Sequence, residues 1–595
     1  MYKNEDLVFD PEHPLQVLKR GTYEQWVNVK GKKRRFLVHI PRGCREAAPG
    51  IFVLSPDHQT ADDLLQNTCW TWLSETEESK EKPVIFFLEP EADVWHTDES
   101  YGCEDGDVAY VEAVFARLSD RHLVNIHESS VYLFGYGSGG TLAQMAAMWN
   151  PAVYAGLCTI DAKVSPAYME AAGRDFCLNL GGFDDPKHRY GIKKGDIPLP
   201  VWLIDGETPD VPLYDYWKRS NHADTTCQIS ADTISHTRTA FTAHPYNEDL
   251  AAHTVWESHI SKAAAQNRLP CRIWKDFLNT HRRWMGDPGG NLRMNQDPVL
   301  DLGAEYHFER VDGWLREWYT YVPDCVKSRP DRPVPLVFAC HGYTCNGAIY
   351  MGNSGWHHVA DDYGFIVVFP TAGYGQMQVE NAYCSGDNLL LPAWNIFHKE
   401  TQPEEFPFFR YLINRTAREY PIDRTRVFVT GHSLGSLMVQ MLGLAMPECF
   451  AAIAPCSGVL FDGLEREPLS LPEVAARQDL ELPVWMFAGS EEAFLVPDRP
   501  EGNNRTAYTI NAWLGLNHMK PKAPTDWTQG WKTHDQRWQD LIYQKNGVPL
   551  VGFTRVEYMP HATMEEMSRR IWAEFFTHFA RRDGRIIYCE GEGKE

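Results

Sequence analysis

The residues with the clearest chemical potential lie at 431–436, which read GHSLGS. Ser433 is the centre of a G-x-S-x-G pattern, which is typical of a nucleophilic serine on a tight strand-to-helix turn. The β-rich run RVFVT precedes the pattern and the helical run LMVQMLGLAM follows it, as such a turn requires. Gly431 and Gly435 supply the small residues that the crowded turn needs. The pattern therefore predicts a nucleophile at Ser433, the alternative being an ordinary serine in a glycine-rich turn.

A serine hydroxyl needs a general base, and the base needs a carboxylate that fixes its tautomer. On this type of turn the chain order is serine, acid, histidine. His561 follows the strand-like run FTRVEYM and precedes an amphipathic helical run, which is where the base is expected. The acid is expected after the apolar run LPVWMFAG. Glu492 is the first choice there, Glu491 the second, and Asp498 a more distant candidate.

An oxyanion that develops on the substrate needs N–H donors already in place. One donor is expected from the backbone of Leu434, the residue after the nucleophile. The other is expected from the loop HGYTCNG at 341–347, which follows the apolar run PLVFAC. His341 and Gly342 let the backbone approach closely, which makes the Tyr343 amide the predicted second donor and His341 a candidate for contact with the substrate.

Composition limits the remaining classes of function. The chain has 595 residues, with 57 Lys and Arg against 80 Asp and Glu, a net charge of −23. This charge argues against nucleic acid or an anionic membrane as the main partner. The 14 cysteines show no metal-ligand spacing, so neither a metal nor another cofactor is expected. The opening residues MYKNEDLVFDPEHPLQ lack the pattern of a secretory signal, which favours a cytoplasmic protein, with a processed secreted form as the alternative.

An internal repeat organises the chain. Residues 131–157 align without a gap on 427–453, and Gly137 then stands opposite Ser433. Both segments predict a strand, a glycine turn and a helix. Short runs that are apolar on both faces alternate with helical runs in both halves, as expected for buried parallel strands. The sequence predicts two tandem α/β-hydrolase domains, 1–295 and 296–595, each a mostly parallel sheet flanked by helices.

The first half is predicted to be a degenerate copy that lacks the nucleophile. Pro209 stands where the second half has its acid, with Asp210 beside it as an alternative acid, and Pro56-Asp57 replaces the His-Gly pair of the oxyanion loop. His281, after the strand-like run CRIWKDFLN, is the one residue that matches the base. The half is expected to cover the cleft, to present a surface to a partner, or to pair with a second copy of the chain.

The second half carries an insert at 496–550 between the acid and the histidine. It is rich in tryptophan, with Trp513, Trp527, Trp531 and Trp538. Long loops with this aromatic density are usually functional. We expect a cap over the cleft in which Trp513 binds the substrate, the alternative being a structural insert.

The runs PLVFACHGYTCNG, GFIVVFPTA, AWNIF and YPIDRTRVFVTGHSLGS resemble the polyhydroxybutyrate-depolymerase-type esterases, a group of α/β-hydrolases that includes feruloyl and acetylxylan esterases. The resemblance covers 305–585 and implies a carboxylic ester hydrolase acting on a small or oligomeric ester. Trp394 matches a tryptophan near the substrate cleft in that family, which implies a role in binding, the alternative being a packed core tryptophan. The family usually has aspartate as the acid, whereas Glu492 stands at the matching place here.

Two other functions stay open at this point. A peptidase or amidase on the same fold would show the same turn, base and oxyanion loop. A protein in which neither half is catalytic would be a binding or scaffold protein, although the intact set of residues in the second half counts against it.

Overall fold

The computed structural model describes most of residues 21–589. The residues outside the description are 1–20, 43, 45–47, 77–81, 99, 103–105, 119–125, 178–190, 207–209, 224–226, 230–232, 239–252, 260–268, 284–291, 296–298, 381–384, 401, 461–480, 491, 493–504, 521–529, 535–536, 558, 560 and 590–595. The chain divides into two compact units. Unit 1 comprises residues 1–297 with 376–390, and unit 2 comprises 298–375 with 391–595.

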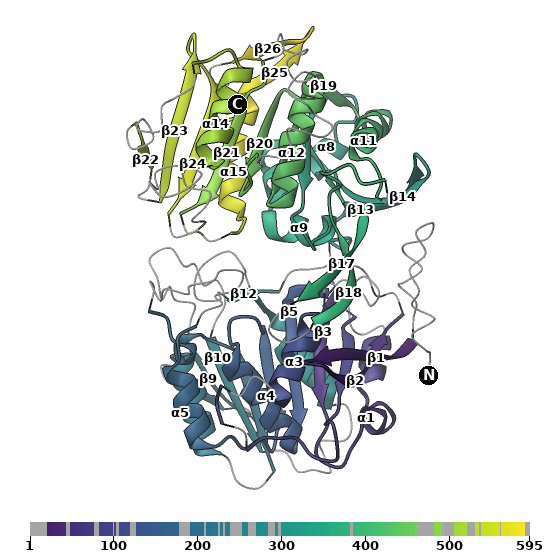
Figure 1. Ribbon diagram of the computed structural model, residues 1–595, viewed down its shortest axis with the longest axis vertical. Coiled ribbons are helices and arrows are strands. Elements are labelled where there is room, and N and C mark those ends of the chain that lie inside the picture. Colours follow the sequence, from purple (N-terminus) through teal and green to yellow (C-terminus); the bar gives the residue numbers. More distant parts are fainter. Residues whose placement is uncertain are drawn as a thin grey trace. The chain divides into compact units, whose positions relative to one another are not determined.

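Unit 1 is built on one ten-stranded sheet with the strand order β1-β2-β4-β3-β5-β6-β7-β10-β9-β8 (Figure 1). Its strands are β1 (Gly21–Val29), β2 (Lys32–Ile40), β3 (Ala48–Leu54), β4 (Val84–Leu88), β5 (Ile126–Tyr136), β6 (Gly156–Ile160), β7 (Val201–Asp205), β8 (Cys227–Ile229), β9 (Thr233–Arg238) and β10 (His253–His259). Its helical segments are α1 (Ala61–Asn67), α2 (Trp70–Glu75), α3 (Asp107–Phe115), α4 (Gly137–Trp149), α5 (Pro166–Arg174), η3 (Lys194–Asp196), α6 (Val211–Ser220), α7 (Leu269–Arg272), η4 (Ile273–Phe277) and η5 (Leu278–Thr280). A small sheet of β11 (His281–Arg283) and β12 (Leu292–Met294) follows.

Unit 2 repeats this sheet with the strand order β13-β14-β16-β15-β19-β20-β21-β24-β23-β22 (Figure 1). Its strands are β13 (Ala304–Val311), β14 (Trp314–Tyr321), β15 (Val334–Cys340), β16 (Ile366–Pro370), β19 (Ile422–His432), β20 (Ala452–Cys456), β21 (Val484–Gly489), β22 (Lys532–His534), β23 (Trp538–Lys545) and β24 (Val548–Val556). Its helical segments are α8 (Asp324–Lys327), α9 (Gly347–Ser354), α10 (Trp356–Tyr363), α11 (Glu405–Glu419), α12 (Leu434–Ala445), η6 (Pro447–Cys449), α14 (Arg505–Leu516), α15 (Glu565–Glu574) and η8 (Phe576–His578). Two hairpins complete the described elements, β17 (Tyr374–Glu380) with β18 (Ser385–Pro392) and β25 (Phe579–Arg582) with β26 (Arg585–Tyr588).

The central strands of each sheet are parallel and the edge strands are antiparallel. In unit 2, β19 pairs in parallel with β15 and β20, and β21 pairs in parallel with β20 and β24. The hairpins β13–β14 and β22–β23 form the antiparallel edges. Because parallel strands are connected by helices that cover both faces, this order yields an α/β sandwich. The prediction of two tandem α/β-hydrolase folds is confirmed for fold class.

Strand β19 shows how the sequence divides between the two faces of its sheet. Val427 and Val429 join the core cluster that also contains residues of α11, α12 and α14. Phe428 points to the opposite face, where its ring stacks on Phe576 at 4.6 Å between centroids. Since side chains alternate along a strand, the run VFV buries apolar surface against both helical layers. This double burial fixes the register of β19 and therefore the position of the serine that follows it.

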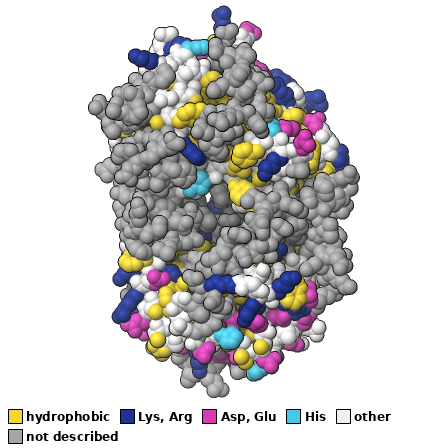
Figure 2. Space-filling model, viewed as in Figure 1, with side chains coloured by type: hydrophobic (Ala, Val, Ile, Leu, Met, Phe, Trp, Pro, Cys, Tyr) yellow, Lys and Arg dark blue, Asp and Glu magenta, His cyan; other side chains and the backbone are white. Residues whose placement is uncertain are grey.

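The described surface of unit 1 carries acidic and basic side chains interspersed over the face shown in Figure 2. Across the described residues, every helix is too short or too polar to serve as a bilayer-spanning segment.

Candidate active site

Ser433 lies at the turn between β19 and α12, and its backbone adopts φ 55° and ψ −120°. A serine holds a positive φ of this kind only under strain that the surrounding packing maintains. A Cβ added to Gly431 would lie 2.7 Å from the Gly435 carbonyl oxygen and 2.8 Å from the Cys340 Cβ. A Cβ added to Gly435 would clash with the carbonyl oxygens of Cys340 and His341. The two flanking glycines are therefore steric requirements of the turn.

Replacing Gly435 by alanine is expected to destabilise the protein by about 3 kcal/mol or more, because the added methyl group meets backbone atoms that cannot rotate away. Gly515 on α14 is the matched control, since a Cβ there meets nothing within 4 Å. Gly515→Ala should leave stability unchanged or raise it by up to about 1 kcal/mol, because alanine favours a helix over glycine. Urea unfolding of both variants measures the difference, and equal midpoints would contradict the steric account.

The structure brings Ser433, His561 and Glu492 into one hydrogen-bonded chain. The Ser433 hydroxyl donates to His561 Nε2 over 2.7 Å. His561 Nδ1–H donates to Glu492 Oε2 over 2.6 Å. The His561 side chain is 40% exposed, whereas that of Glu492 is 1% exposed. A partly open imidazole between a hydroxyl and a buried carboxylate is an arrangement that can activate the hydroxyl as a nucleophile.

Two opposing effects act on the base. Burial lowers the pKa of His561, but the hydrogen bond and the negative charge of Glu492 outweigh it, so that the pKa lies above the ordinary 6.5. A second histidine, His432, faces the same ring, with 4.7 Å between the two ring centroids. Burial and the neighbouring His561 hold the pKa of His432 well below 6.5, so His432 stays neutral beside the base.

Glu492 follows β21 and is anchored at both carboxylate oxygens. Besides the bond from His561 to Oε2, Oε1 accepts from the Ser457 hydroxyl over 2.7 Å and from the Gly489 amide over 2.8 Å. The structure thus brings the first-choice acid to the histidine. Glu491 and Asp498, the other two candidates, lie outside the described residues.

The two predicted oxyanion donors come from separate segments, the start of α12 and the loop after β15. The Leu434 amide is the first N–H of α12, and the first N–H groups of a helix have no partner within the helix. The loop after β15 packs directly against the serine, because a Cβ added to Gly342 would lie only 3.3 Å from the Ser433 Cβ. Tyr343 follows in that loop and is half-buried. The role of the Leu434 and Tyr343 amides as oxyanion donors stays a prediction.

His341 and Trp394 were predicted to contact the substrate, and their burial argues against it. His341 is 0% exposed and Trp394 is 2% exposed. The Trp394 indole donates to the His341 carbonyl oxygen over 2.8 Å, and His341 Nε2 accepts from the Ala372 amide over 2.9 Å. Burial lowers the pKa of His341 to about 4, which keeps the ring neutral for these bonds. Both residues are therefore packed in the interior beside the 341–347 loop, which corrects the predicted contact with substrate.

The expected tryptophan-rich cap is also corrected where the structure describes it. Within the predicted insert, α14, β22 and β23 belong to the helical layer and the edge of the main sheet. Trp513 on α14 is 1% exposed, and its indole donates to Gln440 Oε1 over 3.1 Å in the core. In unit 1, Trp217 on α6 makes the same bond to Gln144 over 2.6 Å. Trp513 is therefore a core residue of the repeated fold, and Trp527 lies outside the described residues.

Sequence reasoning missed two residues beside the triad. His432 was visible within G-H-S-L-G, but its ring contact with His561 depends on the fold of a loop 129 residues later. Ser457 follows β20 and had no motif around it. Its bond to Glu492 arises because β20 lies between β19 and β21 in the sheet, which a linear pattern does not reveal.

Unit 1 keeps the shape of the turn without the serine. Gly137 occupies the position with φ 52° between β5 and α4. Strand pairing sets Leu54 against Gly135 as it sets Cys340 against Gly431, so the His-Gly pair is replaced by Ser55-Pro56 and not by Pro56-Asp57. Asp57 then stands opposite Tyr343, and its amide donates to the Ser138 hydroxyl over 2.8 Å. The amide equivalent to a predicted oxyanion donor is thus already occupied.

The match between His281 and the base is wrong. The run CRIWKDFLN is helical, from α7 to η5, and His281 begins β11 after it. Arg283 in β11 donates to the Tyr154 carbonyl oxygen as Arg581 in β25 donates to that of Phe450, so His281 corresponds to the start of β25 and not to His561. The segment that corresponds to the His561 loop, 260–268, lies outside the described residues, and its sequence contains no histidine.

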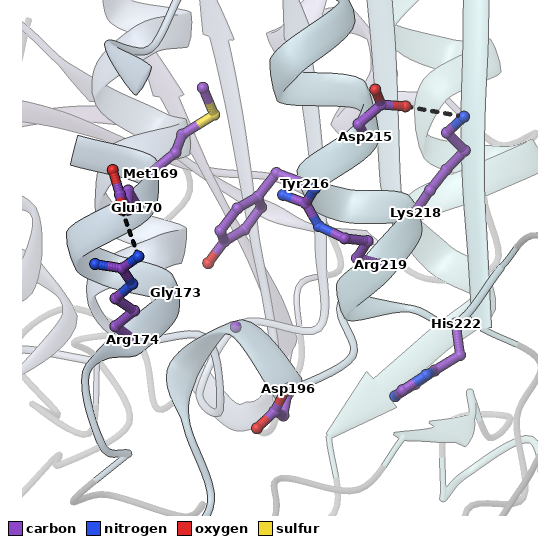
Figure 3. A pocket seen from close by; sticks show the side chains of 11 residues that line it. Met169, Glu170, Gly173, Arg174, Asp196, Asp215, Tyr216, Lys218, Arg219 and His222 are labelled. Carbon is purple, nitrogen blue, oxygen red and sulfur yellow. Dashed lines mark ion pairs between the residues drawn. The ribbon is translucent and has the colours of Figure 1, made fainter. Parts of the chain in front are cut away.

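A pocket of about 700 Å³ opens between α5, η3 and α6 of unit 1 (Figure 3). Its charged side chains pair largely along their own helices, Glu170 with Arg174 at 2.6 Å and Asp215 with Lys218 at 3.1 Å. The pocket contains none of the predicted site residues. Among the described residues, no cluster of three or more His, Cys, Asp or Glu is arranged to hold a metal ion.

No protein-family model matches the chain. Acetylxylan esterase A of Aspergillus awamori is 30% identical over 145 residues, which is 24% of this chain and 41% of that protein. Feruloyl esterase B of Neurospora crassa is 30% identical over 154 residues, 24% of this chain and 43% of that protein. The chain thus spans less than half the length of these relatives.

Among solved structures, the acetyl xylan esterase from Aspergillus awamori has a TM-score of 0.30 at 17% identity, covering 44% of this chain and 94% of that one. A likeness at this level carries no weight for function. The chain is therefore similar over part of its length to an acetylxylan esterase and a feruloyl esterase, and its sheets have the strand order of an α/β-hydrolase fold.

Proposed function

We propose that unit 2 is a serine carboxylic-ester hydrolase that works through an acyl-enzyme. The observation that carries the proposal is the hydrogen-bonded chain from the Ser433 hydroxyl through His561 to the buried Glu492 carboxylate, built on a strained strand-to-helix turn. Such a chain supplies a nucleophile, a general base and a group that fixes the base's tautomer.

In the proposed reaction, Ser433 Oγ attacks the ester carbonyl carbon while His561 Nε2 takes the hydroxyl proton. The carbonyl oxygen becomes an oxyanion, which the Leu434 and Tyr343 amides stabilise by hydrogen bonds. The tetrahedral intermediate then collapses, and His561 gives its proton to the leaving alcohol. Water, deprotonated by His561, attacks the acyl-Ser433 ester in the second half of the cycle and releases the acid.

The proposed substrates are short-chain, hydroxyalkanoate or aromatic feruloyl-type esters, small or oligomeric. The names of the relatives support the short-chain and feruloyl-type esters of this range, since the matched proteins are an acetylxylan esterase and a feruloyl esterase. Unit 1 is proposed to be a copy without activity, because Gly137 replaces the serine and Ser138 accepts the hydrogen bond of the Asp57 amide.

A fluorophosphonate probe tests the proposal directly, because it phosphonylates only a serine that an adjacent base activates. We expect the folded protein to be labelled, with the added mass on the peptide that contains Ser433. In parallel, a panel of p-nitrophenyl acetate, p-nitrophenyl butyrate, methyl ferulate, hydroxybutyrate oligomers and aminoacyl anilides should show hydrolysis of esters ahead of amides. Faster turnover of the anilides would indicate a peptidase, and absence of both labelling and hydrolysis would indicate a binding protein.

The pH dependence follows from the raised pKa of His561. The base must be neutral to accept the serine proton, so kcat/KM should fall as pH decreases through the pKa of the free protein's histidine. Because Glu492 raises that pKa above 6.5, the midpoint of the acid limb is expected above pH 6.5. A kcat/KM profile for p-nitrophenyl acetate between pH 5 and 9 measures it, and a midpoint below 6.5 would contradict the raised pKa of His561.

A further inference from the structure

Ser457 occupies the carboxyl end of β20, between the strand that leads to Ser433 and the strand that leads to Glu492. It is 3% exposed, and its φ is 57°, in the left-handed region. Its amide donates to the Phe487 carbonyl oxygen of β21 over 2.7 Å, while the preceding Cys456 carbonyl oxygen accepts the Ser433 amide over 3.0 Å. One dipeptide therefore joins the backbone of the nucleophile to the backbone of the acid strand.

The side chain of Ser457 completes the set of donors around the acid. Glu492 Oε1 accepts hydrogen bonds from the Ser457 hydroxyl over 2.7 Å and from the Gly489 amide over 2.8 Å. Oε2 accepts the hydrogen bond from His561 over 2.6 Å. A carboxylate on a flexible glutamate can rotate about its last bond. Two donors on one oxygen fix that rotation, so that the other oxygen stays aimed at the imidazole.

Unit 1 provides an independent view of the same position. Asp161 follows Ile160 at the end of β6 as Ser457 follows Cys456 at the end of β20, and it has φ 53°. Its carboxylate accepts the Gly206 amide over 2.8 Å. Gly206 is equivalent to Gly489, because each glycine lies at the same distance after the repeated run LPVW. In both units, the residue after this strand has a left-handed backbone and a polar side chain that forms a hydrogen bond at the end of the neighbouring strand.

We propose that Ser457 is a positioning residue of the esterase site, which orients the Glu492 carboxylate toward His561. The inference rests on the proposed function of unit 2. Ser457 does not touch the reacting atoms and acts through Glu492 and His561. The groups that face His561 in the described structure are Glu492, Ser433 and the neutral His432.

Ser457→Gly is the cleanest test, because glycine adopts φ 57° without strain and removes only the hydroxymethyl group. We expect kcat for p-nitrophenyl acetate to fall roughly tenfold with KM changed less than twofold, since a hydrogen bond to a charged group is lost behind the base. The acid limb of kcat/KM should move to lower pH, because a less firmly held Glu492 raises the pKa of His561 by less. The melting temperature should change by less than about 3 °C.

Ser354→Ala is the matched control, since Ser354 is also fully buried and its hydroxyl also donates, to the Tyr350 carbonyl oxygen over 2.6 Å. It should leave kcat and the acid limb unchanged. Ser457→Ala provides a second variant should the glycine variant fail to fold, and the same shift of the limb is expected in it. Activity within twofold of wild type and an unmoved acid limb in either Ser457 variant would overturn the proposal. Full activity of Ser433→Ala in the same assay would instead overturn the proposed function itself.

Discussion

Ser433→Ala is expected to lower kcat for p-nitrophenyl acetate and butyrate by about 10⁴-fold or more. The alanine lacks the atom that forms the acyl-enzyme, so the remaining groups can at best promote direct attack by water. Binding should persist, because the Leu434 and Tyr343 amides are unchanged. Initial rates with substrate in excess, together with loss of fluorophosphonate labelling, measure the effect.

Ser436→Ala is the matched control for this substitution. Ser436 lies three residues after Ser433, in the first turn of α12, and is fully buried. Its hydroxyl faces the Gly458 carbonyl oxygen at 3.5 Å and makes no bond to His561. The control variant should keep most of its activity. An active Ser433→Ala protein would show that the hydrolysis arises elsewhere in the chain.

Glu492→Gln is expected to lower kcat roughly 10³-fold, although the shape of the side chain is kept. The two donors on Oε1, Ser457 and Gly489, require an acceptor there, so the amide oxygen must take that place. The amide nitrogen then faces His561 Nδ1 and donates to it. Nδ1 can accept only when the imidazole proton sits on Nε2, and in that tautomer Nε2 cannot take the proton of Ser433.

The same substitution in another histidine–glutamate pair controls for the loss of charge. Glu565 is the first residue of α15, the helix that follows His561, and its carboxylate accepts a hydrogen bond from His358 Nδ1 over 2.7 Å. Glu565→Gln should retain activity within a few-fold, as should Glu491→Gln. Loss of activity in Glu491→Gln with an active Glu492→Gln protein would reverse the assignment of the acid. Steady-state kcat for the three variants decides between these outcomes.

The fold and the nucleophile were predictable because both leave local signals. Runs such as VFVTG are apolar on both faces, as strands between two helical layers must be, and the turn needs glycine at fixed offsets from Ser433. His561 followed from chain order together with its place between a strand-like run and an amphipathic helical run. The choice between Glu491 and Glu492 could not be settled from the sequence, because both residues are glutamates and only the direction of each side chain in the fold distinguishes them.

The wrong predictions each have a physical cause. The run CRIWKDFLN is short and apolar, and such a run fits a strand or a buried helix equally well by periodicity. Trp513 was assigned to a cap because aromatic density in a long connection suggests a binding surface. In the structure the same indole makes a hydrogen bond inside the core, and an aligned tryptophan in unit 1 makes its counterpart. His341 and Trp394 lie close to the predicted site, but their side chains are buried in the interior.

The turn at Gly137 has a wider consequence. Its backbone keeps a positive φ although the position carries no side chain, and its neighbours Gly135 and Gly139 still sit against backbone atoms. The curvature of the chain there is thus maintained by close packing against backbone atoms, whatever side chain position 137 carries. In this architecture the shape of the turn therefore does not depend on a nucleophilic side chain, and a unit whose turn carries glycine in place of serine retains the same fold.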